Sequence, residues 1–310
     1  MIPRVPLREA LSDPNLLGTA IAGDSWRSWR ALLIAAMGEE LSEDEREIFT
    51  KLTGRVREPL QPVDQFAAVI GRRGGKSRAM ATLACYLAGL CEHTALVPGE
   101  RGVLLCVALD QRVAKIILDY AEACFERSPI LKQLIAGRTA DALELTNGIT
   151  LEVRPASFRK LRGPTYVAVI ADELAFWYVD AAYANPDVEI LNAVEPGLAT
   201  TGGPLILASS PHARRGVLWE MFRRHHGAGG EDHPRLRRGF LRTQSDSETT
   251  DREPNCGWVG ADQRHYLGGP TGLIPQVARS DLRCGDRRRA RLLVCRRSLR
   301  QPGRRDPERR

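Results

Sequence analysis

Short apolar runs alternate with longer amphipathic segments through the middle of the chain. The runs are apolar at nearly every position, which is typical of strands buried on both faces of a parallel sheet. We expect strands in FAAVI (66–70), GVLLCVAL (102–109), YVAVIADE (166–173) and PLILASSP (204–211). Helices are expected over 76–93, 111–126 and 216–226. The alternation predicts an α/β fold, with a mostly parallel sheet that is covered by helices on both faces.

A hairpin is predicted around Asn147-Gly148, because this dipeptide favours a tight turn and stands between the apolar pieces ALEL and ITLEVRP.

Residues 1–60 have a different, helical and polar pattern. Trp26, Trp29, Leu33 and Met37 recur at spacings of three and four, which places them on one face of a helix. Ser42 followed by Glu45 indicates a capping box at the start of a second helix.

Beyond about residue 227 neither a helical nor a strand repeat continues. Residues 231–310 hold 19 arginines, no lysine and 11 acidic residues, a net charge of +8, which leaves −1 for residues 1–230. The overall charge of +7 is therefore a property of the tail. We divide the chain into a helical segment (1–60), an α/β domain (61–228) and an Arg-rich, irregular tail (229–310).

Two interpretations of this tail stay open. The loss of periodicity and of lysine is compatible with translation out of frame, as in a damaged gene. The rival is a disordered arm whose arginines bind DNA phosphates. The nucleotide sequence in the other two frames decides between them.

The composition argues against secretion, membrane insertion and zinc binding. Seven cysteines without paired spacing predict the reduced thiols of a cytosolic protein. No apolar run reaches the roughly 18 residues that span a bilayer, and the N-terminus lacks the pattern of a secretory signal. Neither C-x-x-C nor H-E-x-x-H occurs. We therefore expect no membrane partner.

A Gly-rich turn, GRRGGKS (71–77), stands between an expected strand and an expected helix. Glycines let backbone N–H groups converge on phosphate oxygens, and a helix N-terminus adds positive potential. The spacing departs from G-x-x-x-x-G-K-[ST], because Ile70 occupies the position of the first glycine. As a phosphate loop, the turn would bring Lys76 to the β- and γ-phosphates of ATP and the Ser77 hydroxyl to Mg²⁺. The alternative is a basic surface turn. The residues assigned to nucleotide binding are Gly71, Arg73, Gly74, Gly75, Lys76, Ser77 and Arg78.

Two carboxylates end a later apolar run. Asp172 and Glu173 close VAVIADE, at the end of a strand where ligands of open α/β sheets bind. Asp172 is assigned to Mg²⁺ and Glu173 to the general base that activates water. Two solvated acids at an exposed strand end are the alternative.

Two hydroxyls end the last predicted strand, in LILASSP. We expect this strand to lie beside that of Asp172, where Ser209 and Ser210 would sense the loss of the γ-phosphate. A Ser-Ser-Pro turn that only closes the strand fits the residues equally well.

GRRGGKS, VIADE and LASSP, in this order and spacing, resemble the motifs of the ATPase domain of the large terminase subunit of tailed phages. The similarity extends over about residues 20–225. It includes Arg162-Gly163 before VIADE, and VALDQRVAKIILDYAE resembles the family's motor segment. The resemblance implies a P-loop NTPase of the ASCE/RecA-like class.

The resemblance also implies roles for single residues. Arg72 matches the position proposed as an arginine finger or γ-phosphate sensor, in a phosphate loop of a shorter form than usual. Asp172 and Glu173 match the Walker B pair of the family, and Ser209 and Ser210 match its coupling motif.

The function implied by the resemblance is ATP hydrolysis with Mg²⁺, coupled to translocation of double-stranded DNA into a viral capsid. The implied partners are a small terminase subunit, a portal protein and further copies of the chain in a ring. The implied location is the cytoplasm of the bacterial host, with transient attachment to the procapsid portal. A nuclease domain follows the ATPase in this family. After Pro211, none of the aspartates Asp246, Asp251, Asp262, Asp281 and Asp286 ends a four-residue apolar strand, so we expect no nuclease activity in this chain.

Two other functions fit the same motifs. A helicase- or repair-type ATPase shares the fold but normally has a second motor lobe, for which we find no pattern here. An inactive prophage remnant would bind ATP without turnover.

Overall fold

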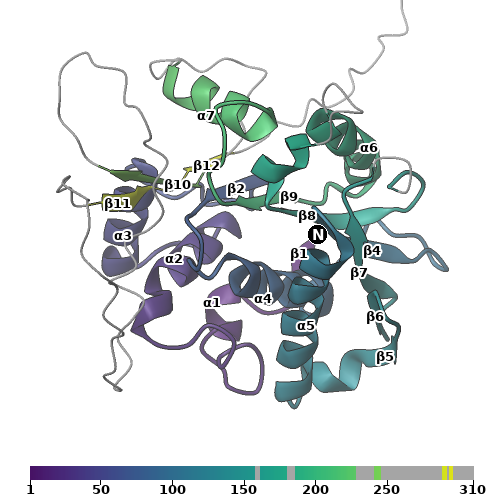
Figure 1. Ribbon diagram of the computed structural model, residues 1–310. Coiled ribbons are helices and arrows are strands. Elements are labelled where there is room, and N and C mark those ends of the chain that lie inside the picture. Colours follow the sequence, from purple (N-terminus) through teal and green to yellow (C-terminus); the bar gives the residue numbers. More distant parts are fainter. Residues whose placement is uncertain (158–160, 180–185, 228–240, 246–287, 292, 296–310) are drawn as a thin grey trace, which may run out of the picture.

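A mixed, mostly parallel sheet forms the centre of the computed structural model, which describes residues 1–157, 161–179, 186–227, 241–245, 288–291 and 293–295 (Figure 1). Neighbouring strands of its central part are parallel throughout. In spatial order they are β2 (Gln65–Val69), β9 (Leu205–Ser209), β8 (Tyr166–Asp172), β4 (Gly102–Ala108) and β7 (Ile149–Pro155). The four strands predicted from apolar runs are therefore confirmed, and β9 lies between β2 and β8.

The predicted hairpin is confirmed beside β7, toward the edge of the sheet that β5 (Ile135–Arg138) forms. β6 (Ala142–Leu145) pairs with β7 in antiparallel register, and Gly148 in the turn has a φ of +83°. The further antiparallel strand β5 pairs with β6 and was not predicted.

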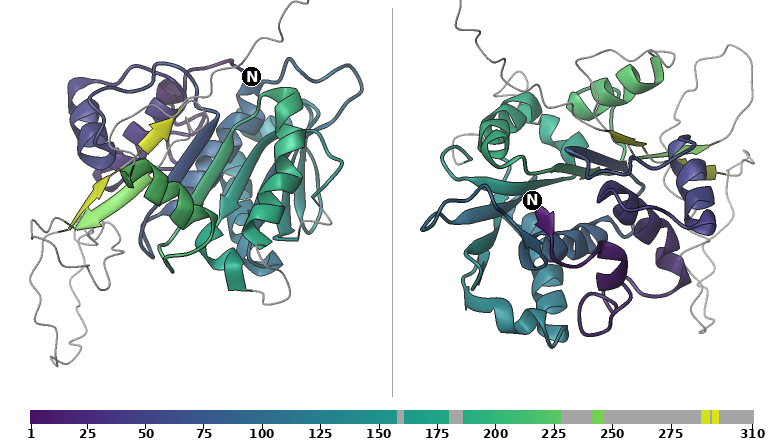
Figure 2. Two further views of the ribbon diagram at one scale, coloured as in Figure 1. Left: turned by 90° about the horizontal axis from the view of Figure 1, so that it is seen from above. Right: turned by 180° about the vertical axis from the view of Figure 1, so that it is seen from behind.

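Helices cover both faces of the sheet, as predicted, and each face has its own apolar core. One core joins alternate strand residues such as Phe66, Leu104 and Ile170 to the N-terminal helices, α4 and α5. The other joins the intervening residues, such as Val69 and Leu207, to α6 and α7. Figures 1 and 2 show these two layers. The helices are α1 (Leu7–Ala10), α2 (Arg27–Ala36), α3 (Glu43–Thr53), α4 (Lys76–Gly89), α5 (Gln111–Arg127), α6 (Pro186–Thr201) and α7 (Val217–Gly227). Short 3-10 helices span Asp24–Trp26, Leu131–Leu134 and Leu174–Val179.

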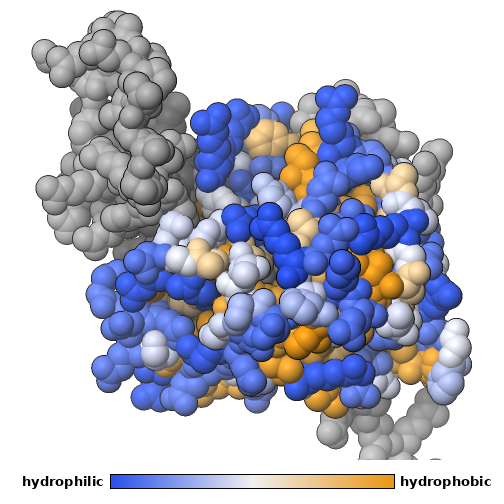
Figure 3. All heavy atoms as spheres, turned by 90° about the horizontal axis from the view of Figure 1, so that it is seen from below, coloured by the Kyte–Doolittle hydropathy of each residue, from blue (hydrophilic) through white to orange (hydrophobic). Residues whose placement is uncertain are grey.

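The N-terminal helices share the core of the α/β domain. Trp29, Phe49 and Leu33 are buried in the same cluster as Phe66 and Tyr86. The predicted capping box is present, since the Ser42 side chain accepts from the Glu45 N–H and the Glu45 side chain accepts from the Ser42 N–H. Seen from below, the surface of the molecule is mainly hydrophilic, with apolar patches between the polar side chains (Figure 3).

Two helices differ from the prediction. α4 ends at Gly89 instead of continuing to His93, because β3 (Cys91–Glu92) pairs with β1 (Ile2–Pro3) at the chain's beginning. α6 was not predicted, because Pro196 lies inside it and proline normally ends or kinks a helix.

The described parts of the predicted tail are three strands. β10 (Leu241–Ser245) and β12 (Leu293–Cys295) pair with β2, and β11 (Arg288–Arg291) pairs with β10. They lie at the β2 edge of the sheet in Figure 2. Most of 229–310 lies outside the described residues, so the domain boundary and the expected disorder stay predictions.

Among the described residues, no helix combines the length and the apolar character that a membrane crossing requires.

Candidate functional site

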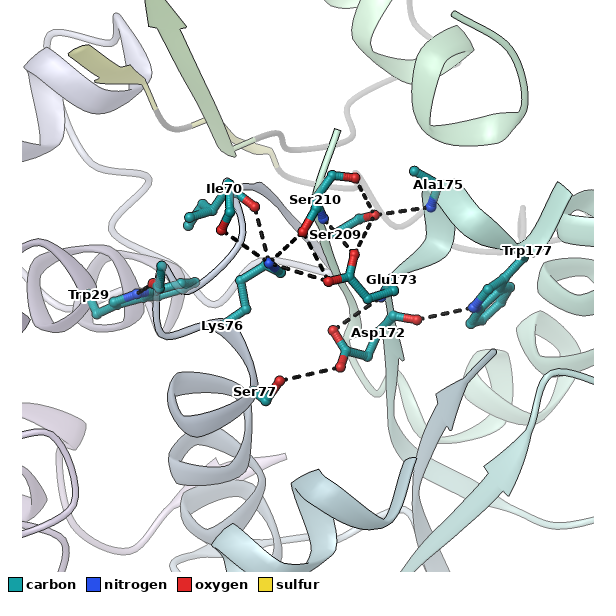
Figure 4. A network of polar contacts seen from close by, with 12 residues as sticks. Trp29, Ile70, Lys76, Ser77, Asp172, Glu173, Ala175, Trp177, Ser209 and Ser210 are labelled. Carbon is teal, nitrogen blue, oxygen red and sulfur yellow. Dashed lines mark hydrogen bonds and ion pairs between the residues drawn. The ribbon is translucent and has the colours of Figure 1, made fainter. Parts of the chain in front are cut away.

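The predicted motifs meet where β2, β8 and β9 end. Asp172 is the last residue of β8, Ser209 is the last residue of β9, and the loop after β2 leads into Lys76 at the start of α4. The carboxyl ends of parallel strands share one edge of a sheet, which brings together residues far apart in the sequence. Figure 4 shows the resulting polar network.

The loop from Gly71 to Gly75 is a tight turn that only glycine allows at two positions. The Gly74 N–H donates to the Gly71 carbonyl at 3.2 Å. A Cβ on Gly74 would lie 2.4 Å from the Ile70 Cγ2 atom, and Gly75 has a φ of +79°. Gly75 is the N-cap of the 14-residue helix α4, so the loop ends at a positive helix terminus. This layout fits the anion site predicted for GRRGGKS.

Lys76 lies inside the network with only 6% of its surface exposed. Its Nζ atom donates to the Ser210 Oγ atom at 2.8 Å and to the carbonyl oxygens of Ile70 and Gly71 at 3.1 and 3.3 Å. It also forms an ion pair with Glu173, with 3.4 Å between Nζ and Oε1. A buried ammonium group is a charged hydrogen-bond donor, which suits it to bind an anionic ligand.

Glu173 is held by the end of β9. The Ser210 N–H donates to its Oε2 atom at 2.7 Å, and the Ser210 hydroxyl donates to Oε1 at 3.0 Å. The Ser209 hydroxyl reaches Oε2 at 3.4 Å. Glu173 also has a φ of +51°, which is uncommon for a residue with a side chain and typical of functional sites. Both predicted coupling serines therefore contact the predicted base.

Asp172 is 2% exposed and lies next to the start of α4. Its Oδ2 atom is 3.5 Å from the Ser77 hydroxyl, and its Oδ1 atom accepts from the Glu173 N–H at 3.1 Å. Burial, together with the neighbouring Glu173 charge, raises the pKa of Asp172 to about 6. Lys76, by contrast, lowers this pKa without cancelling the rise. The positive charge of Lys76 thus does not fully compensate the buried Asp172 carboxylate, which favours the binding of a cation beside it.

The three arginines of the motif lie in different places. Arg72 and Arg73 are exposed on the loop, and Arg73 has a φ of +61°. Arg78 instead faces the N-terminal segment, where its Nε atom donates to the Ala20 carbonyl at 2.6 Å and its guanidinium lies over the Trp26 ring. Their roles with a nucleotide stay predictions. Arg162, which precedes β8, is exposed.

Trp29 is a neighbour of the loop that sequence reasoning missed. Its indole Nε1 atom donates to the Gly74 carbonyl at 2.8 Å. The spacing of Trp26 and Trp29 indicates a helix face, but no sequence pattern reveals which loop 45 residues later that face contacts.

Comparisons with known proteins give only distant similarities. No protein-family model matches the chain, and no curated protein matches it. The HK97 bacteriophage large terminase is 18% identical, with a TM-score of 0.41 over 54% of this chain and 33% of that one. The Thermus phage P74-26 large terminase ATPase domain is 19% identical, with a TM-score of 0.38 over 64% and 75% of the two chains. S. cerevisiae Dbp5, in a complex with Gle1, is 11% identical, with a TM-score of 0.39 over 74% and 52%.

The chain thus spans about a third of the HK97 large terminase. The predicted fold class rests on the structure itself: a mostly parallel α/β sheet, with a phosphate-type loop after one strand and a carboxylate pair after another.

Proposed function

We propose that this chain is an ATP-hydrolysing motor subunit of the phage terminase type, which couples hydrolysis to translocation of double-stranded DNA. The observation that carries the proposal is the convergence of Lys76, Ser77, Asp172 and Glu173 at one edge of the sheet. A surface turn or two solvated acids would not produce a buried lysine that pairs with a carboxylate held by the neighbouring strand.

The loop and the helix terminus fit the phosphates of ATP. The glycines keep the backbone close to a bound group, and the start of α4 provides partial positive charge. Lys76 would bind the terminal phosphates in place of its present carbonyl contacts, because phosphate oxygens carry more negative charge than peptide carbonyls. Arg72, exposed on the same loop, would stabilise charge on the transferred phosphoryl group.

The donor set also fits Mg²⁺. Ser77 and Asp172 offer a hydroxyl and a carboxylate oxygen within 3.5 Å of each other. Mg²⁺ takes oxygen ligands and is usually bound by one or two carboxylates together with substrate phosphates. The described residues hold no cluster of three metal-ligating acids, histidines or cysteines, so phosphate and water oxygens would complete the shell. When bound, Mg²⁺ neutralises charge on the β- and γ-phosphates.

Glu173 is the proposed general base. Its carboxylate would orient the attacking water and accept its proton, while Ser209 and Ser210 hold the carboxylate in place. Because Ser210 contacts both Glu173 and Lys76, a change at the terminal phosphate would reach β9 directly. This contact supports the coupling role proposed for the serine pair.

The motor part of the proposal rests on the order and spacing of GRRGGKS, VIADE and LASSP. With it we propose the partners that such a motor requires: double-stranded DNA, a small terminase subunit, a portal protein and further copies of the chain in a ring. The proposed location is the bacterial host cytoplasm and, transiently, the procapsid portal.

A DNA-dependent ATPase assay tests this function. We expect the full chain to release phosphate from ATP with Mg²⁺, and double-stranded DNA to increase the rate. A rate of phosphate release that DNA leaves unchanged would contradict the motor function but would still support ATP hydrolysis. ATP binding without any turnover, with or without DNA, would instead identify a remnant that only binds the nucleotide.

A further inference from the structure

The N-terminal segment holds the phosphate loop from the side opposite the carboxylates. Trp29, on α2, is 1% exposed, and its Nε1 atom donates to the Gly74 carbonyl at 2.8 Å. Figure 4 shows Trp29 on one side of the loop, with the Lys76 Nζ atom and Glu173 on the other. A buried hydrogen bond between a side chain and a loop carbonyl fixes the orientation of that peptide group.

The orientation of this carbonyl determines where the next N–H points. The Gly74 carbonyl and the Gly75 N–H belong to one planar trans peptide, in which the two groups point in opposite directions. With the carbonyl directed at Trp29, the Gly75 N–H points to the opposite side of this peptide, away from the Trp29 indole N–H. Within the described residues, the structure records no acceptor for this N–H.

A second tryptophan, Trp26, packs against the loop and restricts its movement. A Cβ on Gly75 would lie 2.8 Å from the Cη2 atom of Trp26, so the ring packs directly against the Gly75 backbone. Arg78, in the first turn of α4, places its guanidinium 5.1 Å from the centre of the same ring. The loop therefore has little freedom to rotate the peptide that joins Gly74 to Gly75.

We infer that Trp29 is a positioning residue of the phosphate loop, which presets the Gly75 N–H as a donor to a bound phosphate. The inference rests on the proposed function, since it assigns Trp29 to the same nucleotide site. Removing the indole N–H leaves the buried Gly74 carbonyl without its partner, so that only the packing of Trp26 still restrains the orientation of the peptide. A bound phosphate then has to fix the orientation of this peptide, and the cost of that ordering weakens binding.

The test compares Trp29→Phe with Tyr86→Phe in the full chain. Tyr86 lies on α4, and its hydroxyl donates to the Val5 carbonyl at 2.7 Å. Tyr86→Phe thus removes a matched hydrogen bond between the N-terminal segment and α4, away from the loop. Affinities for ADP and for inorganic tripolyphosphate are measured by titration calorimetry, and stability is measured by thermal unfolding.

We expect Trp29→Phe to lose more stability than Tyr86→Phe, because it also shrinks a buried ring, and only Trp29→Phe to bind ADP and tripolyphosphate about tenfold more weakly. The two ligands should weaken equally, because the Gly75 N–H would contact phosphate and not the base. If Trp29→Phe does not fold, 3-benzothienylalanine at position 29 keeps the ring and removes only the donor.

Equal affinities in the wild type and the position-29 variant would overturn the inference alone. So would an equal loss of affinity in Tyr86→Phe. A wild-type chain that binds neither ADP nor tripolyphosphate would overturn the proposed function and the inference with it.

Discussion

Glu58 and Asp172 are both almost completely buried carboxylates, 6% and 2% exposed, yet their pKa values shift in opposite directions. Glu58 accepts from the Arg46 Nε and Nη2 atoms at 3.0 and 2.7 Å and from the Leu41 N–H at 2.9 Å. These bonds, led by the two from Arg46, lower the pKa of Glu58 to about 2. Burial and the charge of Glu173 raise the pKa of Asp172 to about 6.

The difference separates a structural carboxylate from one prepared for a ligand. The chain itself neutralises Glu58 with a two-point guanidinium contact. It leaves Asp172 next to a second carboxylate, with a single lysine that also serves Glu173. A buried acid that the chain does not compensate is a candidate for binding a cation or for catalysis.

Lys76→Ala should have the largest effect on the functional side of this comparison. The buried ammonium group contacts Glu173 and Ser210 and is the proposed partner of the terminal phosphates. We expect kcat/KM for ATP hydrolysis to fall at least ~100-fold, as when a positioned donor to a developing charge is removed. Steady-state phosphate release measures it. Activity within about twofold of the wild type would show that Lys76 does not take part.

Glu58→Gln should have the next largest effect, on stability alone. It breaks a hydrogen-bonded ion pair whose carboxylate is buried and whose guanidinium is partly exposed, and we expect the free energy of unfolding to fall by about 2 kcal/mol with kcat unchanged. Denaturant unfolding measures it. The control is Glu47→Gln, because Glu47 pairs with Lys51 on the surface, where solvent screens the ion pair and its loss should change stability little.

The pH dependence of wild-type stability is a second test of the structural role of Glu58. The pKa of Glu58 is lower in the folded state than its ordinary value of 4.5. Its stabilising contribution is therefore complete above pH 4.5 and is lost as the pH falls toward about 2. Glu58→Gln should have a flatter stability profile over this window. A profile parallel to that of the wild type would contradict the structural role of Glu58.

Asp172→Asn should change the free energy of unfolding by a smaller amount than Glu58→Gln and in the opposite direction. Because the pKa of Asp172 is raised from 3.8 to about 6, its contribution to stability is greatest below pH 3.8 and is lost as the pH rises through about 6. In EDTA at pH 7.5 we expect asparagine to stabilise the fold by about 1 kcal/mol, since it removes a buried charge. At pH 3.5 the gain should vanish. Destabilisation at pH 7.5 would show that the chain compensates Asp172 after all.

Local patterns in the sequence predict most of the sheet and the main site residues. Continuous apolar runs define β2, β4, β8 and β9, and parallel strands bring their carboxyl ends together. The capping box at Ser42 is equally local. These features need no information about distant contacts.

Contacts between distant segments explain what the sequence does not predict. α4 ends early because Cys91 pairs with Pro3, and the Trp29–Gly74 and Arg46–Glu58 contacts likewise depend on the folded chain. α6 contains Pro196-Gly197, which resembles a loop signal. In the structure a Cβ on Gly197 would lie 2.6 Å from the Tyr166 ring, so this glycine serves close packing instead.

The central claim is that Glu173 is the base of an ATP-hydrolysing site. The most direct test measures ATP binding and phosphate release in parallel for the wild type and Glu173→Gln, which keeps the size of the side chain but cannot accept the proton. The account predicts that the variant binds ATP as tightly as the wild type and releases phosphate at least ~100-fold more slowly. Equal rates of phosphate release in the two proteins would contradict it.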